Sequence, residues 1–564
     1  MVPTAPPTPA LKPDAPGAPA ADRPPCATLP GVRAVSRRTF LALGATVVVA
    51  GCSGRDGGAP PTSRPEPSAP PTGPAPTSPP TAAATTAITE PATTPPPATA
   101  PPTTAPLAAD PFTLGVAAGD PDEASAVLWT RLTGEGLPDA VAVAWEVARD
   151  EGFADVVGSG TATAHAADGH ALHVVAALEG PAWYRFHAGG FTSRLGRAAP
   201  APAAAGELRV AAASCQHFET GFYAAHRDVA EWSPDLVVFL GDFIYEGAAR
   251  PVGGDVVRSH DGPEPTDVAG YRARYAHYLS DGDLQASRAA CPWLVVWDDH
   301  EVENNYAGLV PQEPTEAAAF PARRDAAYRA WWEHMPVRLP APSPGAPYPI
   351  ARTVAWGGLA DLVLLDGRQF RSDQACGAPT LSLDPPCPEA ADPARTMLGP
   401  DQETWTGEAL AASSATWATV CQQTVLTDLR FNGAILNYDQ WDGYAPARDR
   451  LLAQAAAVER LVVLTGDIHL AGVGVLPGLG VEFVTTSISS MGNVDASLQP
   501  ILDSFATVAA AELTHRGYTR HTVTPTRWSA EYRIVENVAD PASAVATWRT
   551  FHVDATARDL VATT

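Results

Sequence analysis

The stretch Leu294-Val295-Val296-Trp297-Asp298-Asp299-His300-Glu301-Val302-Glu303-Asn304-Asn305-Tyr306 decides how this chain folds. Residues 293–297 form an apolar run that is typical of a buried strand and too short for a helix of a globular protein. The run ends abruptly in carboxylate, imidazole and carboxamide side chains. Because α/β sheets keep their sites at the carboxyl ends of strands, we interpret this stretch as one edge of a functional site. The alternative is a solvated acidic loop.

Three further apolar runs end in the same way. Residues 208–215 are followed by Gln216-His217, residues 235–240 by Gly241-Asp242-Phe243-Ile244-Tyr245-Glu246, and residues 461–465 by Gly466-Asp467-Ile468-His469. A single Gly-Asp is a common turn, whereas four such ends on neighbouring strands predict a metal site. Helical patterns at residues 316–334 and 448–460 intervene, and they predict an α/β sheet that is buried on both faces.

The residue types at these strand ends restrict the kind of metal. A thiol from Cys215 and a phenol from Tyr245, beside carboxylates and imidazoles, suit a highly charged transition metal better than magnesium. A carboxylate shared by two cations would hold them about 3.5–4 Å apart, which is the spacing used for in-line phosphoryl displacement. The strand ends therefore favour a two-metal hydrolytic site.

Charge and length set further limits. The chain has 564 residues, enough for two or three domains, and 45% of them are hydrophobic. A net charge of −25 argues against nucleic acid as a partner, because nucleic acid demands a basic face. The same charge means that an anionic substrate must be attracted by local cations.

The N-terminal region, residues 1–52, is predicted to be a targeting segment. Ser36-Arg37-Arg38-Thr39-Phe40-Leu41 resembles a twin-arginine export motif, and the apolar run 40–50 is too short to span a bilayer. The run ends in Val49-Ala50-Gly51-Cys52, which resembles a lipoprotein cleavage box. We expect export by the twin-arginine translocase to the cell envelope or beyond, with a lipid anchor at Cys52. The alternative is a chance arginine pair before an apolar stretch.

Composition divides the rest of the chain. Residues 53–108 are rich in Pro, Thr, Ala and Ser, which predicts a disordered tether. Residues 109–200 contain short strand patterns at 126–132, 141–147, 171–175 and 183–188, which predict a small all-β, fibronectin-III-like sandwich. Residues 201–564 form the predicted catalytic domain. Cys376 and Cys387 bracket a short Pro-rich loop and are candidates for a disulfide, whereas Cys291 and Cys421 are predicted to be buried thiols.

Several motifs together resemble the alkaline phosphatase D family within the calcineurin-like metallophosphoesterases. The resemblance extends from Phe112 to Val553 and predicts a metallophosphoesterase-type double-sheet α/β sandwich that follows the small β domain. Its motifs are Ser-Cys-Gln at 214–216, Gly-Asp-Phe-Ile-Tyr-Glu at 241–246, Trp-Asp-Asp-His-Glu-Val-Glu-Asn-Asn at 297–305, Leu-Asp-Gly-Arg-Gln-Phe-Arg at 365–371, Met-Leu-Gly-Pro-Asp-Gln at 397–402, Asn-Tyr-Asp-Gln-Trp-Asp-Gly-Tyr at 437–444 and Gly-Asp-Ile-His at 466–469.

The resemblance implies a role for each metal ligand on the first side. Asp242 matches the bridging carboxylate. Cys215 and Tyr245 match ligands of a ferric ion, with Asp467 beside them. Relatives outside the family open the first strand with Asp-x-His, so the presence of Cys215 argues against two interchangeable divalent ions.

On the second side, the resemblance implies a calcium ion, which oxygen ligands would suit. Asp299 is the first candidate ligand, and Asp298 and Asn304 are the alternatives. His469 is expected on this side as well. Other divalent metals are the alternative at both positions.

The substrate groups follow from the same resemblance. His300 is expected to contact the phosphoryl oxygens or the leaving group. Arg368 and Arg371 are expected either to neutralise phosphate charge or to form an exposed salt bridge. The motif Gly466-Asp467-Ile468-His469 continues into Leu470-Ala471-Gly472, which is less polar than expected and bears on the shape of the substrate pocket.

Taken together, the sequence predicts an exported, monomeric, metal-dependent phosphohydrolase. It would hydrolyse phosphate monoesters and diesters through a metal-activated hydroxide. The alternative is a surface lipoprotein that retains the fold as a non-catalytic binding module.

Overall fold

A computed structural model describes residues 105–377, 382–556 and 560–563. The predicted signal region, with Arg37, Arg38 and Cys52, lies outside these residues, as does most of the predicted tether. Among the described residues, no helix is both long enough and apolar enough to cross a membrane.

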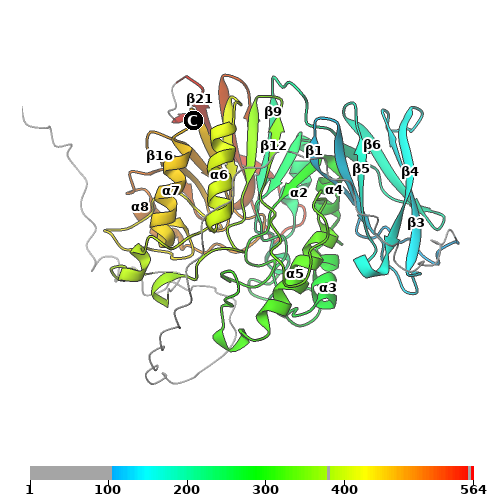
Figure 1. The fold of residues 1–564 in the computed structure, drawn as a ribbon, viewed down its shortest axis with the longest axis horizontal. Coiled ribbons are helices and arrows are strands. Elements are labelled where there is room, and N and C mark those ends of the chain that lie inside the picture. Colours follow the sequence, from blue (N-terminus) through cyan, green and yellow to red (C-terminus); the bar gives the residue numbers. More distant parts are fainter. Residues whose placement is uncertain (1–104, 378–381, 557–559, 564) are drawn as a thin grey trace, which may run out of the picture. The chain divides into compact units, whose positions relative to one another are not determined.

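Ten strands form the central sheet, in the order β22-β21-β20-β19-β9-β10-β11-β1-β2-β5 (Figure 1). Its middle is the parallel trio β9 (Leu208–Ala213), β10 (Leu236–Phe239) and β11 (Pro292–Val295). These strands are short and entirely apolar apart from Arg209, as expected for strands covered on both faces. The C-terminal strands follow beside β9, namely β19 (Arg516–Val523), β20 (Arg527–Val535), β21 (Val545–Asp554) and β22 (Leu560–Thr563).

The N-terminal strands extend this sheet on its other side. β1 (Val116–Asp122) pairs in parallel with β11, so that Gly119 lies opposite Trp293. β2 (Ser125–Arg131) and β5 (Ala171–Ala177) continue from β1. A separate five-stranded sheet packs on them through an apolar core, and it comprises β3 (Ala140–Ala148), β4 (Val156–His165), β6 (Ala182–Ala188), β7 (Phe191–Thr192) and β8 (Gly196–Ala198).

The two faces of β2 show how the β-rich part joins the rest. Leu128 belongs to the core shared with the five-stranded sheet, whereas the adjacent Trp129 belongs to the core shared with the catalytic strands. The indole Nε1 of Trp129 also donates to the carbonyl of Glu333, 3.1 Å away. Because successive side chains of a strand point to opposite faces, β2 packs against both the five-stranded sheet and the catalytic strands. The domain boundary at residue 200 remains a prediction.

A seven-stranded sheet has the order β12-β13-β14-β15-β17-β16-β18. Val462 and Leu464 of β15 face the core shared with the central sheet, and Leu461 and Val463 face helices α6 and α7. The predicted double-sheet α/β fold is confirmed. The strands are β12 (Arg352–Trp356), β13 (Ala360–Leu364), β14 (Trp417–Cys421), β15 (Leu461–Thr465), β16 (Ala471–Leu476), β17 (Gly480–Val484) and β18 (Val508–Glu512).

The helices begin where capping residues or prolines place them. Asp267 caps α3 by accepting from Gly270 N at 2.8 Å, and Pro446 lies in the first turn of α7. α5 begins later than predicted, because residues 314–316 form a separate 3₁₀ turn. The helices are α2 (Ala224–Trp232), α3 (Val268–Tyr278), α4 (Gly282–Ala290), α5 (Phe320–His334), α6 (Pro400–Ala412), α7 (Ala445–Ala455) and α8 (Gln499–Leu502).

The cysteines divide as predicted. Cys376 and Cys387 form a disulfide with their Cα atoms 5.9 Å apart. Cys291 and Cys421 are buried free thiols, and so is Cys215.

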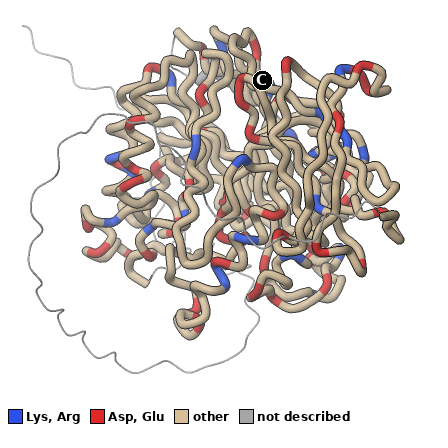
Figure 2. Tube along the Cα trace, turned by 45° about the vertical axis from the view of Figure 1, so that its right-hand side comes forward, with Lys and Arg blue, Asp and Glu red and all other residues tan. Residues whose placement is uncertain are grey.

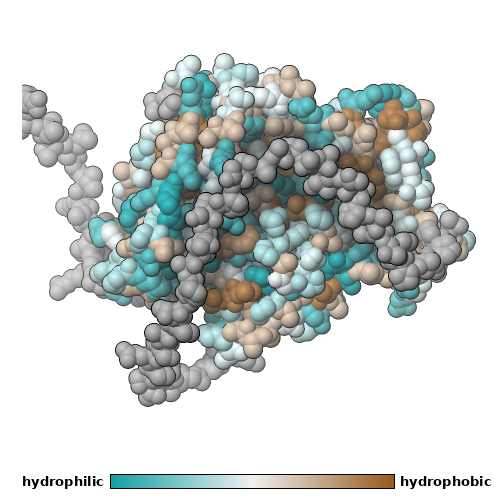
Figure 3. Space-filling model, in the orientation of Figure 1, coloured by the Kyte–Doolittle hydropathy of each residue, from teal (hydrophilic) through white to brown (hydrophobic). Residues whose placement is uncertain are grey.

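Charges and hydrophobic residues are both dispersed. Acidic and basic residues are interspersed along the described chain (Figure 2). Hydrophobic residues lie among hydrophilic ones on the face shown in Figure 3, and Val252 and Leu309, both in loops, are among the most exposed.

Candidate metal centre

The candidate site lies where the two large sheets meet. β9, β10 and β11 are neighbours and supply Cys215, Asp242 and Asp299 just beyond their ends. The fourth strand, β15, belongs to the seven-stranded sheet, so the expectation of four neighbouring strand ends is wrong for this one. A Cβ on Gly466, which follows β15, would lie 2.4 Å from Ser214 Oγ. Glycine therefore lets the end of β15 approach the end of β9.

Four of the candidate ligands have left-handed backbone conformations. The φ angles are 59° at Cys215, 56° at Asp242, 65° at Asp467 and 54° at His469. Non-glycine residues adopt such angles uncommonly, and several of them together often mark a functional site. The chain turns sharply at each strand end and directs these side chains toward the junction of the sheets.

The first donor group combines soft and hard ligands. Donor atoms of Cys215, Asp242 and His469 lie within 4.8 Å of one another. The Tyr245 hydroxyl lies 2.8 Å from Asp242 Oδ2 and 3.0 Å from His469 Nε2. Ser490 Oγ lies 2.8 Å from the same hydroxyl. We refer to Cys215, Asp242, Tyr245 and His469 as the cysteine side.

A second donor group shares Asp242 with the first. It consists of Asp242, Asp299 and His300, again within 4.8 Å. His300 Nδ1 lies 2.6 Å from Glu246 Oε2, and the other oxygen of Glu246 accepts from Asn304 N at 2.8 Å. Glu246 therefore fixes the imidazole ring of His300 in place.

The third donor group consists of Asp298, Asp299 and Asp467. Arg368 is fully buried beside it and forms ion pairs with all three carboxylates, as well as with Asp439 at 2.8 Å. We refer to Asp298, Asp299, Asp467 and Arg368 as the arginine side. Because Arg368 is buried, the interpretation of an exposed salt bridge is wrong.

Burial and neighbouring charge set the protonation of these groups. Burial raises the pKa of Cys215, Asp242 and Tyr245 well above their ordinary values, and the charge of Asp242 adds to this for the thiol and the phenol. Burial also raises the pKa of Asp467 to about 7. In contrast, Arg368 and His300 outweigh burial and lower the pKa of Asp299.

Buried carboxylate oxygens provide a test of whether cations fit. Within the described residues, Asp298 Oδ2 and Asp299 Oδ1 are buried and have no hydrogen-bond partner. Buried polar atoms normally have a partner, and a missing ion is a recognised reason for an exception. Oxygen atoms of this kind suit calcium, and the thiol, phenol and imidazole of the cysteine side suit a transition metal. The residues present fit both ions.

The last motif is arranged differently from the expectation. His469 was expected on the calcium side, but it lies with Cys215 and Asp242. Asp467 was expected beside the iron ligands, but it groups with Asp298 and Asp299. Both residues have left-handed backbone conformations.

The carboxamide of Asn304 contacts Gln312. Its carboxamide nitrogen donates to Gln312 Oε1 at 3.1 Å. Asp298 and Asp299 both belong to a donor group, and Asn304 as a ligand of the second metal stays a prediction.

Sequence reasoning missed residues that support the ligands. Glu301 is buried and accepts from the backbone N–H groups of Asp242, Phe243 and Asp298 at 2.6–3.0 Å. Gln440 donates to Asp467 Oδ2. Both residues lie within motifs that the sequence analysis identified, so their importance could have been suspected. Their supporting roles depend on contacts between distant motifs, which the sequence does not show.

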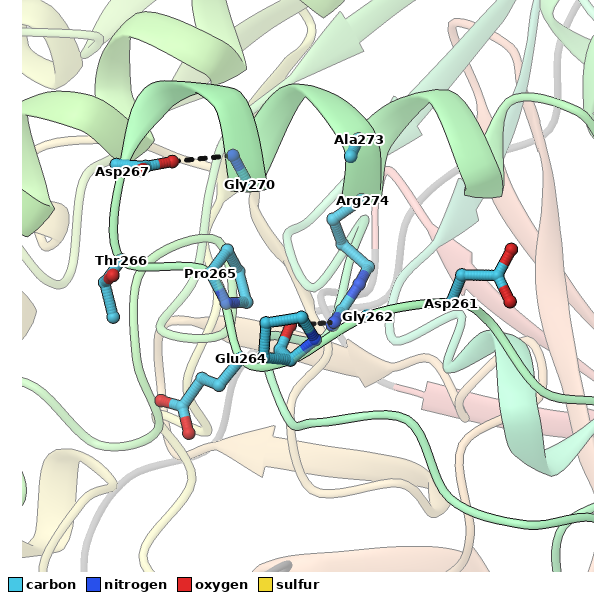
Figure 4. A pocket seen from close by; sticks show the side chains of 10 residues that line it. Asp261, Gly262, Glu264, Pro265, Thr266, Asp267, Gly270, Ala273 and Arg274 are labelled. Carbon is cyan, nitrogen blue, oxygen red and sulfur yellow. Dashed lines mark hydrogen bonds between the residues drawn. The ribbon is translucent and has the colours of Figure 1, made fainter.

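A loop with a pocket precedes α3. The pocket has a volume of about 150 Å³ and lies between residues 261–267 and the first turns of α3 (Figure 4). Arg274 points from the helix toward the loop, donating to Pro263 O at 3.2 Å and also to Tyr245 O. This loop is thereby fixed to the backbone of a candidate metal ligand.

Comparisons with known proteins agree with this geometry. The PhoD-like phosphatase family model matches residues 210–532, and the model of its N-terminal domain matches residues 98–202. Alkaline phosphatase D of Bacillus subtilis (strain 168) is 40% identical over 472 residues, which cover 78% of this chain and 80% of that protein. The solved structure of PhoD matches with a TM-score of 0.77 and 38% identity, covering 81% of this chain and 93% of that one. The chain therefore belongs to the PhoD-like phosphatases and is a phosphohydrolase.

Proposed function

We propose that this phosphatase is metal-dependent and hydrolyses both phosphate monoesters and diesters. The observation that carries the proposal is the shared carboxylate of Asp242, which belongs to two donor groups at once. A carboxylate in this position can hold two cations at the separation that phosphoryl transfer uses.

The donor sets support a different ion on each side. The cysteine side offers a thiol, a carboxyl and a phenol, three groups that become anionic and suit a ferric ion. On the arginine side, the three carboxylates and the neighbouring Asp439 are paired with two guanidinium groups among the described residues, those of Arg368 and Arg371. The remaining negative charge suits a calcium ion. Bound cations would lower the pKa of a water molecule and polarise the phosphoryl oxygens.

His300 is the residue that we assign to the substrate. Its Nδ1 is held by Glu246, and its ring lies on the phenol of Tyr245 with centroids 4.1 Å apart. Its donor atom also lies within reach of Asp242 and Asp299. We assign its Nε2 to the phosphoryl oxygens or the leaving-group oxygen, because the other nitrogen is occupied.

Arg368 acts through the carboxylates. Its guanidinium is surrounded by four of them and is fully buried, so it keeps the ligand set together at a fixed geometry. We therefore assign it a positioning role in place of the direct contact with phosphate that the sequence suggested.

Hydrolysis of nitrophenyl phosphates tests this proposal. The purified protein, loaded with iron and calcium, is assayed on nitrophenyl phosphate and bis-nitrophenyl phosphate at alkaline pH, before and after chelation. We expect turnover of both esters, loss of activity with chelator, and its return when the metals are added back. Activity that survives complete metal removal would contradict metal dependence, and a strong preference for the monoester would contradict the diester assignment.

We also propose that the protein is exported through the twin-arginine pathway and anchored by lipid at Cys52. The support is the pair Arg37-Arg38 before an apolar run that ends at Cys52. Replacing both arginines with lysine is expected to abolish export. Cys52→Ala is expected to release the exported protein from the membrane fraction, and a variant that stays bound would contradict the anchor.

A further inference from the structure

His217 is a histidine beside the metal centre that the mechanism does not use. It lies two positions after Cys215 and precedes the 3₁₀ turn Phe218–Thr220. Its own N–H donates to Ser490 Oγ at 3.0 Å, and its carbonyl accepts from Ser489 Oγ at 2.9 Å. The residue is therefore held rigidly next to the cysteine side.

The contact of its ring with the backbone determines which nitrogen carries the proton. Nδ1 of His217 lies 3.1 Å from the backbone nitrogen of Glu219. A backbone N–H can only donate, so Nδ1 must accept and have no proton. The imidazole is consequently neutral, with its N–H at Nε2.

The rings of His217 and His300 both lie against the phenol of Tyr245. The centroids of His217 and Tyr245 are 4.5 Å apart, and those of His300 and Tyr245 are 4.1 Å apart. His217 therefore adjoins the same candidate metal ligand as His300, the residue that we assign to the substrate.

The Nε2–H group has no partner within the described residues. His217 is 7% exposed, and its Nε2 is not among the fully buried polar atoms without a hydrogen bond. This donor therefore reaches solvent from an otherwise buried ring.

The turn that follows His217 is also held in place. Glu219 binds the loop that follows Glu246, accepting from Arg250 N and Nε at 2.9 Å each and from Val257 N, through its carbonyl, at 2.8 Å. A preorganised donor without a partner among the described residues, next to a candidate metal ligand, favours binding over mere capping of a turn, for which a shorter Asn would suffice.

We propose that His217 is a substrate-binding residue, whose Nε2–H donates a hydrogen bond to an oxygen atom in the alcohol portion of the phosphoester. The inference rests on the proposed function, because it concerns the same site. It assigns a preference to the enzyme: esters with an ether or hydroxyl oxygen near the phosphate bind better than purely alkyl esters of equal size.

Two matched diesters test the inference. 2-Methoxyethyl nitrophenyl phosphate and butyl nitrophenyl phosphate differ by one oxygen in place of one methylene. The metal-loaded wild type is expected to favour the ether in kcat/KM by about three- to tenfold, the value of one neutral hydrogen bond. In His217→Asn, which keeps an acceptor for Glu219 N, the ratio is expected to fall to about one.

The controls separate substrate binding by His217 from its capping contact with Glu219 N. His187→Asn, in the five-stranded sheet, is expected to keep the wild-type ratio. A wild type without preference for the ether, or a His217→Asn variant that keeps the preference, would overturn the inference. A wild type that hydrolyses neither diester would overturn the proposed function on which the inference rests, so the two failures are distinguishable.

Discussion

The cysteine side and the arginine side of the metal centre solve the problem of buried charge differently. On the cysteine side, burial raises the pKa of Cys215, Asp242 and Tyr245, and the groups that contact Asp242 and Tyr245 are mostly other donor groups. On the arginine side, the guanidinium of Arg368 is already in place and lowers the pKa of Asp299, although burial still raises the pKa of Asp298 and Asp467. The fold thus supplies part of the positive charge on the arginine side, whereas on the cysteine side a bound ion would have to supply more of it.

The two sides should therefore respond differently to the loss of metal. Without a cation, the cysteine side relaxes by taking up protons, because its anionic forms are disfavoured by burial. The arginine side retains ion pairs whatever ion is bound. We therefore expect the cysteine side to govern activity and the arginine side to govern stability.

Asp242→Asn should have the largest effect, because Asp242 belongs both to the donor group of the cysteine side and to the group that contains Asp299 and His300. We expect kcat to fall by about a thousandfold, which corresponds to about 4 kcal/mol of lost charge stabilisation. Steady-state assays together with metal analysis check this, and Asp401→Asn at the exposed start of α6 is the matched control. A variant that keeps both metals and most of its activity would break the assignment of Asp242 as the shared ligand.

Arg368→Met tests the arginine side. Removal of the guanidinium leaves buried carboxylates unpaired, and we expect the free energy of unfolding to fall by about 3–5 kcal/mol. Denaturant unfolding with and without calcium measures this, and added calcium should restore part of the loss. Arg149→Met, on an exposed ion pair, should leave the unfolding midpoint unchanged. Equal losses in the two variants would refute the proposed role of Arg368.

Tyr245→Phe tests the cysteine side. A ferric–phenolate pair should give the purified protein a broad visible absorption, and the variant should lose it. Because the phenol also contacts Asp242 and His469, we expect kcat to fall by about 10- to 100-fold. Tyr184→Phe removes a hydroxyl outside the metal centre and should keep the colour. A colourless wild type that contains stoichiometric ferric ion would rule out the phenolate ligand.

Asn304→Ala should have the smallest effect. Its carboxamide nitrogen binds Gln312, so we expect less than about a threefold change in kcat/KM, comparable to one exposed hydrogen bond. Asp299→Asn, measured in parallel, should lower kcat/KM and the amount of bound calcium far more. The reverse order would make Asn304 the ligand of the second metal.

The strand ends could be predicted because they depend on local sequence. Apolar runs followed by Cys215, Asp242 and Asp299 indicated a site at one edge of a sheet, and these residues do converge. The grouping of Asp467 and His469 could not be predicted, because both residues follow β15, which lies in a different sheet from β9, β10 and β11. The burial of Arg368 could not be predicted either, since Asp298, Asp439 and Asp467 lie 70, 71 and 99 positions away in the chain.

The position of β9 in the central sheet has a consequence for synthesis on the ribosome. β9 pairs with β10 on one side and with β19 on the other, and β19 begins at Arg516. β19 emerges roughly 300 residues after β9, so at about 5–20 residues per second the nascent chain waits ~15–60 s for that partner. During this interval, β9 has one open edge next to Cys215, and an open edge is prone to pair with other chains. Shielding of this edge during synthesis would therefore raise the yield of active enzyme.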